Sequence, residues 1–574
     1  MRKITDFNAD WLFSAAAEEG EEKPFADSRV KLPFFHSILT MPVCTFTKTW
    51  TASDSDEGKT VFIEFSQISG EAEIYCNDNL IAETSSIVHK RRYQLVSEAK
   101  PGTEYTVKIN IRPASRGDGL FAFTGVNIIT LDSSHFNLLS PGSGLYITSE
   151  AADGKAIIRI KTEVIRPNNY DVVAYTVLNS SGYETASATA KPTSPDTEMI
   201  IDSPDLWEGQ SGAAVYTLKA ELKRDSRVLD ETTSAFGIRD ISVDEDGFFR
   251  LNGFRLPLDG AELTDCSAVK SDTESLHHLD GNALISRMLP SKTNLLSFTD
   301  KEGMVFWYCP AFSGNRTYDM ELFREFLITY RNHPSLAFAV CPAKADEEYF
   351  EEFRKTAEEY APGLICAARK SFDCTPEEIP AGAKLVLLDI PFRTQPEAYI
   401  TFSGRLTGLQ EKHPEKSFAV LASSPLKSEC APKDATEHHI RLWQTFFRQK
   451  GITAYFAGLL SDEKNGEARQ GLISEDRTEL YDAFWFYKSQ FSSEDFIKIT
   501  DPDICETSDK HIDLRCITNR TNLRLLVNGK DRKYKAEKLS DNIYVFRQLK
   551  LKPDHNLLEV SADDECDSIE IIRI

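Results

Sequence analysis

Positive charge is scarce in this sequence relative to negative charge. The 574 residues include 66 lysines and arginines against 89 aspartates and glutamates, which gives a formal net charge of −23. A surface of that sign repels the phosphates of nucleic acids and of anionic membranes. The chain also lacks any run of about 18 apolar residues, the length that a membrane-spanning helix needs. We therefore expect a globular protein with no nucleic-acid partner and no membrane partner.

Paired cysteines and the common cofactor motifs are absent as well. The eleven cysteines are scattered singly, their number is odd, and no CxxC occurs. The N-terminal stretch has no apolar segment of signal-peptide length, so the pattern predicts a reducing, cytoplasmic location. No GxxxxGK[ST] loop, GxGxxG fingerprint, HExxH pair or EF-hand pattern is present. We expect no cofactor and no metal site, because the pairs His277–His278 and His438–His439 lack the spacing of metal ligands.

Alternating apolar and polar residues dominate both ends of the chain. Residues 1–145 contain several such segments, with a tight hairpin signal at Asn77-Asp78-Asn79, and a second set of strand-like segments fills residues 146–240. Residues 493–574 show the same alternation around Asn528-Gly529. Short strands with regular turns predict β-sandwiches in all three regions.

The pattern changes between residues 241 and 492. Apolar runs of four to eight residues, such as those in GMVFWYCP and KLVLLDIPF, alternate with amphipathic stretches such as YDMELFREFLITYRN. Buried strands that alternate with helices indicate a parallel sheet covered by helices. Roughly 250 residues is the size of a (β/α)₈ barrel.

Three segments carry a resemblance to a known family: residues 61–83, VFIEFSQISGEAEIYCNDNLIAE, residues 203–241 and residues 331–335. They resemble the family 2 glycoside hydrolases, the β-galactosidase and β-glucuronidase group. Residues 61–83 are similar to the family's N-terminal jelly roll. Residues 203–241 are similar to the exit of its immunoglobulin-like domain, with matches at Trp207, Tyr216, Phe236, Gly237 and Arg239. Residues 331–335, RNHPS, resemble the segment that leads into a catalytic barrel strand.

The resemblance covers nearly the whole chain in order and implies a multidomain β and α/β architecture. It implies a jelly-roll, sugar-binding-like domain at 1–145 and an immunoglobulin-like β-sandwich at 146–240. A TIM barrel is implied at 241–492, followed by a C-terminal immunoglobulin-like β-sandwich at 493–574.

The resemblance also implies which positions should carry catalysis. Family members use two glutamates at the C-terminal ends of barrel strands, one as acid/base and one as nucleophile. Counted from His333, the acid/base position falls on Lys344, and the nucleophile position falls near Ser423 or Ser424. Several other family positions are also substituted: Ile285 for an Arg, Met288 for a His, Cys309 for a Glu, Ala457 for a Trp and Ser461 for an Asp. A degenerate active site follows from this comparison.

Some acids remain near predicted strand ends. Residues 346–348, Asp-Glu-Glu, are typical of a helix N-terminus, although a bulged strand end would bring one of them to the site instead. Glu262, Asp389 and Asp462 are candidates for a rebuilt carboxylate site, with Glu463 beside the last. The alternative for each of these acids is a structural role, in which its carboxylate is hydrogen-bonded within the fold. Trp307 either lines the barrel mouth, where it would stack on a sugar, or belongs to the core.

We therefore predict a non-catalytic member of this family that binds carbohydrate or takes part in an assembly with a second copy or an active homologue. The first alternative is an active retaining glycosidase whose carboxylates have moved, for example to Glu262 and Asp389. The second is a structural or oligomer-forming protein. A carboxylate pair about 5–5.5 Å apart at the barrel mouth would favour the active enzyme.

Overall fold

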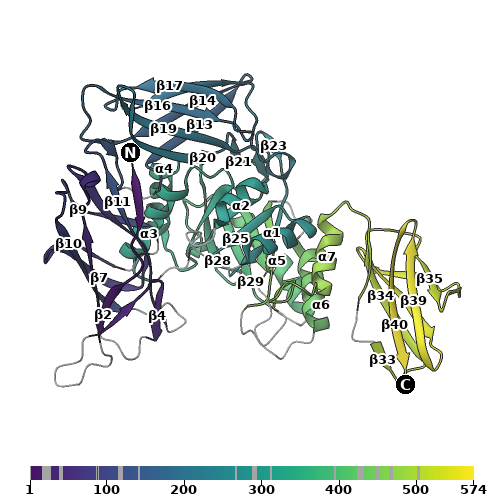
Figure 1. The fold of residues 1–574 in the computed structure, drawn as a ribbon. Helices are drawn as coiled ribbons and strands as arrows, with labels where there is room; N and C mark the ends of the chain where they lie inside the picture. Colours follow the sequence, from purple (N-terminus) through teal and green to yellow (C-terminus); the bar gives the residue numbers. More distant parts are fainter. Residues whose placement is uncertain are drawn as a thin grey trace.

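The computed structural model places three β-sandwiches around a central α/β barrel (Figure 1). It describes residues 2–15, 27–37, 43–85, 87, 89–113, 120–139, 142–194, 196–264, 268–287, 294–310, 313–392, 396–422, 432–446, 451–463, 470–500 and 505–574. Within these ranges no helix has both the length and the apolar character needed to cross a membrane. The predicted fold class is confirmed.

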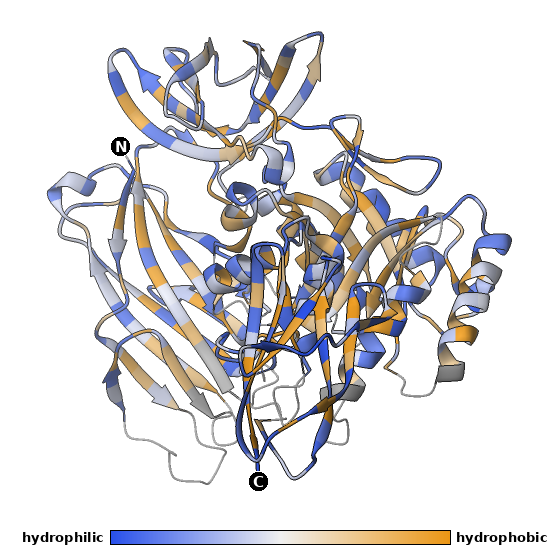
Figure 2. Ribbon diagram, turned by 90° about the vertical axis from the view of Figure 1, so that its right-hand side faces the viewer, coloured by the Kyte–Doolittle hydropathy of each residue, from blue (hydrophilic) through white to orange (hydrophobic). Residues whose placement is uncertain are grey.

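The N-terminal sandwich consists of two antiparallel sheets. One contains β1 (Lys3–Asp6), β4 (Phe34–Ser37), β6 (Thr60–Ile68), β9 (Arg91–Val96) and β11 (Leu120–Leu131). The other runs in the order β3 (Ser28–Val30), β2 (Trp11–Ala15), β5 (Cys44–Thr51), β10 (Glu104–Pro113), β7 (Gly70–Cys76) and β8 (Asn79–Thr84). Their alternation turns one side chain in two toward a shared core that includes Trp11, Phe46 and Ile109. Figure 2 shows this alternation as orange and blue bands along the strands.

The second sandwich stacks a three-stranded sheet on a four-stranded sheet. The first contains β13 (Leu145–Ala152), β14 (Lys155–Thr162) and β18 (Thr197–Asp202). The second contains β16 (Asp171–Leu178), β17 (Glu184–Ala190), β19 (Tyr216–Arg224) and β20 (Arg227–Phe236). A short pair, β12 (His135–Phe136) with β15 (Val164–Ile165), joins them. Phe136 and Leu145 lie in the core of this second sandwich although they precede residue 146.

Eight parallel strands close into the barrel after a small sheet of β21 (Ile241–Val243), β22 (Phe249–Leu251) and β23 (Phe254–Arg255). The barrel strands are β24 (Leu258–Leu263), β25 (Ala283–Ser286), β26 (Val305–Tyr308), β27 (Leu336–Cys341), β28 (Ile365–Ser371), β29 (Leu385–Ile390), β30 (Ser417–Ala422) and β31 (Ile452–Leu459). The helices are α1 (Val269–His278), α2 (Leu295–Lys301), α3 (Arg316–Tyr330), α4 (Glu347–Tyr360), α5 (Pro396–Lys412), α6 (Pro432–Phe446) and α7 (Asp482–Phe491). Their apolar faces cover the outside of the barrel in one large core cluster.

Inward-facing side chains fill the barrel interior and form a floor below its mouth. The barrel strands contribute Ile285, Trp307, Phe338, Leu387 and Phe456 to a separate core cluster. The ring of Trp307 stacks on that of Phe338 at 3.8 Å between centroids and meets Phe456 edge-on at 5.3 Å. The interior is therefore a packed core with no channel through these residues, as expected for this fold.

The RNHPS segment lies at the opposite end of the barrel from the mouth, where β27 begins. Asn332 Nδ2 donates to Leu145 O and Ser234 Oγ, both at 2.9 Å, and its Oδ1 accepts from Ile147 N at 3.2 Å. These bonds fasten the barrel to the second sandwich.

A buried carboxylate completes the same junction. Asp300 Oδ1 accepts from Ser335 N and Oγ, and its Oδ2 lies 2.6 Å from His333 Nδ1. The backbone carbonyl of Asp300 accepts from Trp207 Nε1 at 2.8 Å. The segment thus serves the architecture.

The C-terminal sandwich packs against α7. One sheet contains β32 (Ile497–Ile499), β34 (His511–Thr518), β37 (Ala536–Ser540) and β38 (Ile543–Lys550). The other contains β33 (Glu506–Thr507), β35 (Arg524–Val527), β36 (Lys530–Asp531), β39 (Asp554–Ala562) and β40 (Glu565–Arg573). Ile517 and Ile543 reach the large barrel cluster, and Asn542 Nδ2 donates to Ser489 O at 2.7 Å.

Candidate active site

A layer of polar side chains lies at the C-terminal mouth of the barrel, above the apolar floor. The members of this layer are Glu262 on β24, Arg287 after β25, Cys309 after β26, Arg369 on β28 and Asp389 on β29. The last four follow an inward-facing core residue by two positions, so the alternation of the strand points them inward too. Glu262 joins them through its ion pair with Arg287. TIM barrels place their active sites at this end, so this layer is the candidate active site.

Two arginines neutralise the two carboxylates of this polar layer. Arg369 Nε donates to Asp389 Oδ2 at 2.8 Å, and Arg369 Nη1 lies 3.2 Å from Cys309 Sγ. Arg287 Nε lies 2.7 Å from Glu262 Oε1, an ion pair without the alignment of a hydrogen bond. Glu262 Oε1 and Asp389 Oδ1 accept no hydrogen bond from the described residues.

Burial and charge act in opposite directions on these groups. Burial raises the pKa of Glu262, while Arg287 and Arg369 oppose that rise and Asp389 adds to it. Burial also raises the pKa of the Cys309 thiol. Burial would lower the pKa of Arg369, but Cys309, Asp389 and Glu262 outweigh it and raise that pKa. Arg369 therefore stays charged inside the layer at every ordinary pH.

Lys344, at the position implied for the acid/base, lies outside this layer. It is exposed in the turn after β27, and no described residue forms an ion pair with it. Lys370 Nζ donates to the carbonyls on either side of it, to Ala343 O at 3.3 Å and to Ala345 O at 2.8 Å. The turn is thus held with the Lys344 side chain turned to solvent.

The acids after Lys344 begin a helix, as the sequence predicts. Asp346 is the N-cap of α4, and its carboxylate accepts from Tyr349 N at 2.8 Å. Glu347 accepts from Ala381 N and Gly382 N, and Glu348 pairs with Arg316. None of the three joins the polar layer.

Of the remaining candidates from the sequence, some have structural roles and others lie outside the residues that the structure describes. Asp462 Oδ1 accepts from Gln470 N and Gly471 N, and its Oδ2 accepts from the Tyr481 hydroxyl, all at 2.7 Å, so it organises the chain after β31. Glu463 beside it is exposed. Ser423 and Ser424, near the implied nucleophile position, lie outside the described residues, as does Met288.

Trp307 belongs to the core and not to the surface of the mouth. Its side chain is fully buried between Phe338 and Phe456. The hypothesis that its ring stacks on a sugar is wrong, because both neighbours occupy the space that a sugar would need. Its indole Nε1–H has no acceptor among the described residues.

Sequence reasoning missed Arg369 entirely and gave Arg287 no role. The signal was available in the period of two along β28, where Ile365, Ala367 and Arg369 share the inward face. An arginine at the end of such a row must enter the mouth.

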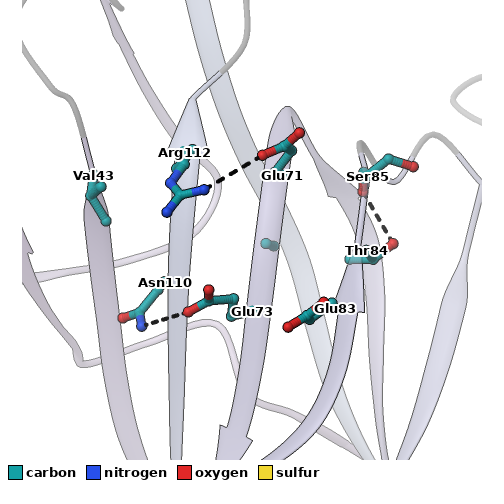
Figure 3. A pocket seen from close by; sticks show the side chains of 9 residues that line it. Val43, Glu71, Glu73, Glu83, Thr84, Ser85, Asn110 and Arg112 are labelled. Carbon is teal, nitrogen blue, oxygen red and sulfur yellow. Dashed lines mark hydrogen bonds and ion pairs between the residues drawn. The ribbon is translucent and has the colours of Figure 1, made fainter.

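A concavity lies on the solvent face of the N-terminal sandwich, away from the barrel mouth (Figure 3). This groove of about 650 Å³ crosses β5, β10, β7 and β8 and is lined by Val43, Glu71, Ala72, Glu73, Glu83, Thr84, Ser85, Asn110 and Arg112. Glu73 accepts from Asn110 Nδ2 at 3.3 Å, and Glu71 lies 3.8 Å from Arg112. Its carboxylates are open to water, unlike those of the barrel mouth, and it offers no desolvated pair for acid–base chemistry.

The described residues also contain no group of three or more His, Cys, Asp or Glu side chains arranged to hold a metal ion.

Comparisons with known proteins agree with this architecture. Residues 143–239 match the family model described as glycosyl hydrolases family 2. A β-glucuronidase of Bacteroides fragilis is 22% identical over 88% of this chain and 83% of its own length. The β-galactosidase BoGH2A of Bacteroides ovatus is also 22% identical, over 58% of this chain and 46% of its own length.

A solved structure shows the same fold over the full chain. The crystal structure of a putative β-galactosidase from Bacteroides fragilis superposes with a TM-score of 0.84 at 16% identity, covering 100% of this chain and 98% of that one. The order of sandwiches and barrel, the family-model match in the second sandwich and the RNHPS junction point the same way. The chain is thus similar to the family 2 glycoside hydrolases in its second sandwich, and it has the fold of the solved structure over its full length.

Proposed function

We propose that this chain is a non-catalytic member of the family 2 glycoside hydrolases that binds carbohydrate at the barrel mouth without hydrolysing it. The observation that carries the proposal is Arg369, a part-buried cation at the mouth, bonded to Asp389 and 3.2 Å from Cys309. The relatives named above are a β-glucuronidase and a β-galactosidase, which supports a sugar as the ligand.

Glycoside hydrolysis makes demands that this mouth does not meet. A retaining mechanism needs one carboxylate free to attack the anomeric carbon and another that carries a proton, with positive charge developing on the sugar between them. Here Asp389 is engaged by Arg369 and Glu262 by Arg287. A fixed guanidinium beside the developing oxocarbenium ion would raise the energy of that transition state.

Two assays on the purified full-length chain test the proposal. Hydrolysis is measured with nitrophenyl β-D-glucuronide, β-D-galactoside, β-D-glucoside and β-D-mannoside, and binding is measured calorimetrically with the corresponding free sugars. We expect binding of at least one sugar and no release of nitrophenol above the uncatalysed rate. Turnover that follows the purified protein would contradict the proposal.

One observation favours the rival, an active glycosidase with relocated carboxylates. Glu262 is buried with a raised pKa, the state in which a carboxyl holds the proton that a general acid donates. In that case Glu262→Gln and Asp389→Asn would each abolish turnover, whereas Asp462→Asn, in the loop after β31, would leave kcat unchanged in the folded fraction.

The biological setting is part of the same proposal. We infer a cytoplasmic protein that acts alone, with a second copy or with an active homologue. All nine cysteines among the described residues are free thiols, which suits a reducing compartment. A structural role without any ligand would be favoured if no sugar bound and the chain formed a stable oligomer in sedimentation experiments.

A further inference from the structure

A cavity of about 230 Å³ lies where the second sandwich meets the end of the barrel that is far from the mouth. Its walls come from β13, from the segment between β20 and β21, from the turn between α3 and β27, and from the turn after α4. Two arginines, Arg239 and Arg331, line this junction cavity, and the one carboxylate among its described lining residues is Asp240. Neither arginine pairs with Asp240 or with any other described carboxylate, since both donate to backbone carbonyls instead.

Arg331 is held in place by contacts that leave its charge unneutralised. As the C-cap of α3, it has its guanidinium carbon 3.9 Å from the centroid of the Tyr146 ring, and its Nη1 donates to Tyr360 O at 3.4 Å. Its Nε is buried and has no acceptor among the described residues. Burial lowers the pKa of Arg331, and Tyr146 and Tyr360 oppose that shift. A buried charged donor is costly to the fold unless water or an anion satisfies it.

Arg239 brings a second cation to the cavity from the side of the sandwich. Its Nη2 donates to Leu336 O at 2.6 Å, and its guanidinium carbon lies 5.9 Å from the centroid of the Trp207 ring. Its other N–H groups donate to none of the described residues. Burial lowers the pKa of Arg239 to about 10, and Asp300 and Asp240 oppose that shift. The guanidinium therefore stays charged at neutral pH, and a negative charge in the cavity would stabilise it.

We propose that the junction cavity is a binding site for a tetrahedral dianion, a phosphate or sulfate group, and that Arg239 and Arg331 hold it. Two guanidinium groups match the two negative charges of such an ion, and each can present parallel N–H donors to its oxygens. Thr148 lines the same cavity on the face of β13 that carries Tyr146, and its hydroxyl makes no bond to the described residues. That hydroxyl is available as a further donor.

An anion in this cavity would tie two domains together. Arg239 follows the last strand of the second sandwich, whereas Arg331 ends a helix of the barrel. A ligand that binds only the assembled junction stabilises the folded chain, and the effect grows with its concentration. This site goes beyond the proposed function, because it lies at the other end of the barrel from the mouth and does not depend on what the mouth binds.

Titration calorimetry and thermal unfolding of the full chain test the site. Inorganic phosphate, sulfate and glycerol 3-phosphate are each titrated at constant ionic strength, with sodium chloride as the balancing salt. We expect saturable binding of at least one of them at millimolar concentration or below, and a rise in melting temperature of about 2 °C or more at saturation. Phosphate and sulfate also stabilise proteins by exclusion from their surface, but that effect does not saturate.

The three anions distinguish the possible sources of the ligand. Tighter binding of glycerol 3-phosphate than of both inorganic ions would support a site for the phosphate of an organic molecule. Tighter binding of inorganic phosphate or sulfate would support a site for the free ion. In either case the same two arginines hold the tetrahedral group.

Variants locate the bound anion. Arg331→Gln keeps a donor near Tyr360 O but removes the charge, and it should weaken binding by about tenfold or more. Arg331→Lys keeps the charge without the planar fork and should weaken binding less. Two controls should bind as the wild type does: Arg159→Gln, at an exposed arginine of the same sandwich that pairs with two glutamates, and Arg287→Gln, at the barrel mouth. Near-UV circular dichroism reports whether each variant keeps its fold.

Three results would overturn the inference. The first is the absence of saturable binding for all three anions, and the second is unchanged affinity in folded Arg331→Gln. The third is loss of binding in Arg287→Gln, because the anion would then lie at the mouth. If Arg331→Gln fails to fold, Arg331→Lys decides: weaker binding supports the junction site, and unchanged affinity overturns it.

Discussion

Arg369 is the residue on which the charge balance of the barrel mouth depends. It lies between the thiol of Cys309 and the carboxylate of Asp389, and its side chain is 14% exposed. Removing one partner of this part-buried ion pair leaves the other charge without compensation where water screens it only in part, whereas removing both is less costly. Arg369 therefore stabilises the mouth through its pair with Asp389.

A double-mutant cycle tests this role of Arg369. We expect Arg369→Met to lower the free energy of unfolding by about 2 kcal/mol, since Asp389 keeps some access to water, and Arg369→Met with Asp389→Asn to recover part of the loss. Thermal denaturation of the four proteins in the cycle provides the measurement. Arg354→Met is the control, because the Arg354–Glu351 pair on the outer helix α4 is more exposed than the Arg369–Asp389 pair, at 38% and 34%, and should contribute less than about 1 kcal/mol. A coupling energy near zero would show that Arg369 and Asp389 act independently.

At the scale of single residues, the sequence singled out the acids of the barrel mouth but not the arginines that pair with them. Glu262 and Asp389 stand out as acids at the ends of apolar runs, and both reach the mouth. Their partners could not be found the same way, because Arg287 and Arg369 come from other strands and meet them only when the barrel closes. Trp307 shows the converse failure: an aromatic residue near a strand end looks the same in sequence whether it faces a ligand or the packed floor.

At the scale of elements, the start of β27 joins the barrel to the second sandwich by close backbone approach. A Cβ added at Gly237 would lie 2.4 Å from Pro334 Cβ and 2.7 Å from its Cγ. The same junction contains the bonds of Asn332 to Leu145, Ile147 and Ser234. Glycine at 237 and proline at 334 are thus complementary parts of one contact.

Two glycine substitutions with opposite expected signs test this contact. Gly237→Ala should lower the midpoint of thermal unfolding, because a rigid proline ring occupies the space of the new methyl group; a loss of about 1–3 kcal/mol is typical of such overpacking. Gly408→Ala is the control: Gly408 lies inside α5, its added Cβ would meet no atom within 4 Å, and alanine there should stabilise by about 0.5–1 kcal/mol. Differential scanning calorimetry measures both. Equal midpoints for Gly237→Ala and the wild type would remove the steric argument.

The elements themselves follow well from the sequence pattern. Alternation of apolar and polar residues predicted the sandwich strands, because such strands are buried on one face only. Continuous apolar runs between amphipathic segments predicted the barrel, because its strands are buried on both faces. The RNHPS segment carried no such period. Because it precedes its strand, it lies at the end of the barrel far from the mouth, and its side chains hold a domain junction there. Only the folded chain shows that its partners come from the second sandwich and from α2.

At the scale of the whole molecule, the N-terminal sandwich is held to the barrel along α3. Arg91 on β9 lies 2.7 Å from Glu325 and 3.6 Å from Glu321. Beside this pair, His89 is 1% exposed and packs against the rings of Phe326 and Tyr330. Neither ring nitrogen of His89 has a hydrogen-bond partner among the described residues. Burial, with a smaller contribution from Arg91, lowers the pKa of His89 to about 4.

This buried histidine makes the contact between the two domains sensitive to acid. A folded-state pKa of about 4 against about 6.5 in the unfolded chain means that the neutral ring is favoured in the fold. The contribution of neutral His89 to the free energy of unfolding is therefore complete above about pH 6.5. It is lost as the pH falls toward 4, and the loss amounts to up to roughly 3 kcal/mol. His89→Phe keeps an apolar ring against Phe326 and should flatten the fall in melting temperature between pH 7 and pH 4.5, whereas His511→Gln, at an exposed position, should leave it unchanged. If the melting temperature falls with pH equally steeply in His89→Phe and the wild type, other groups cause the acid sensitivity. The buried His439, with a pKa of about 3, is the next of these to test.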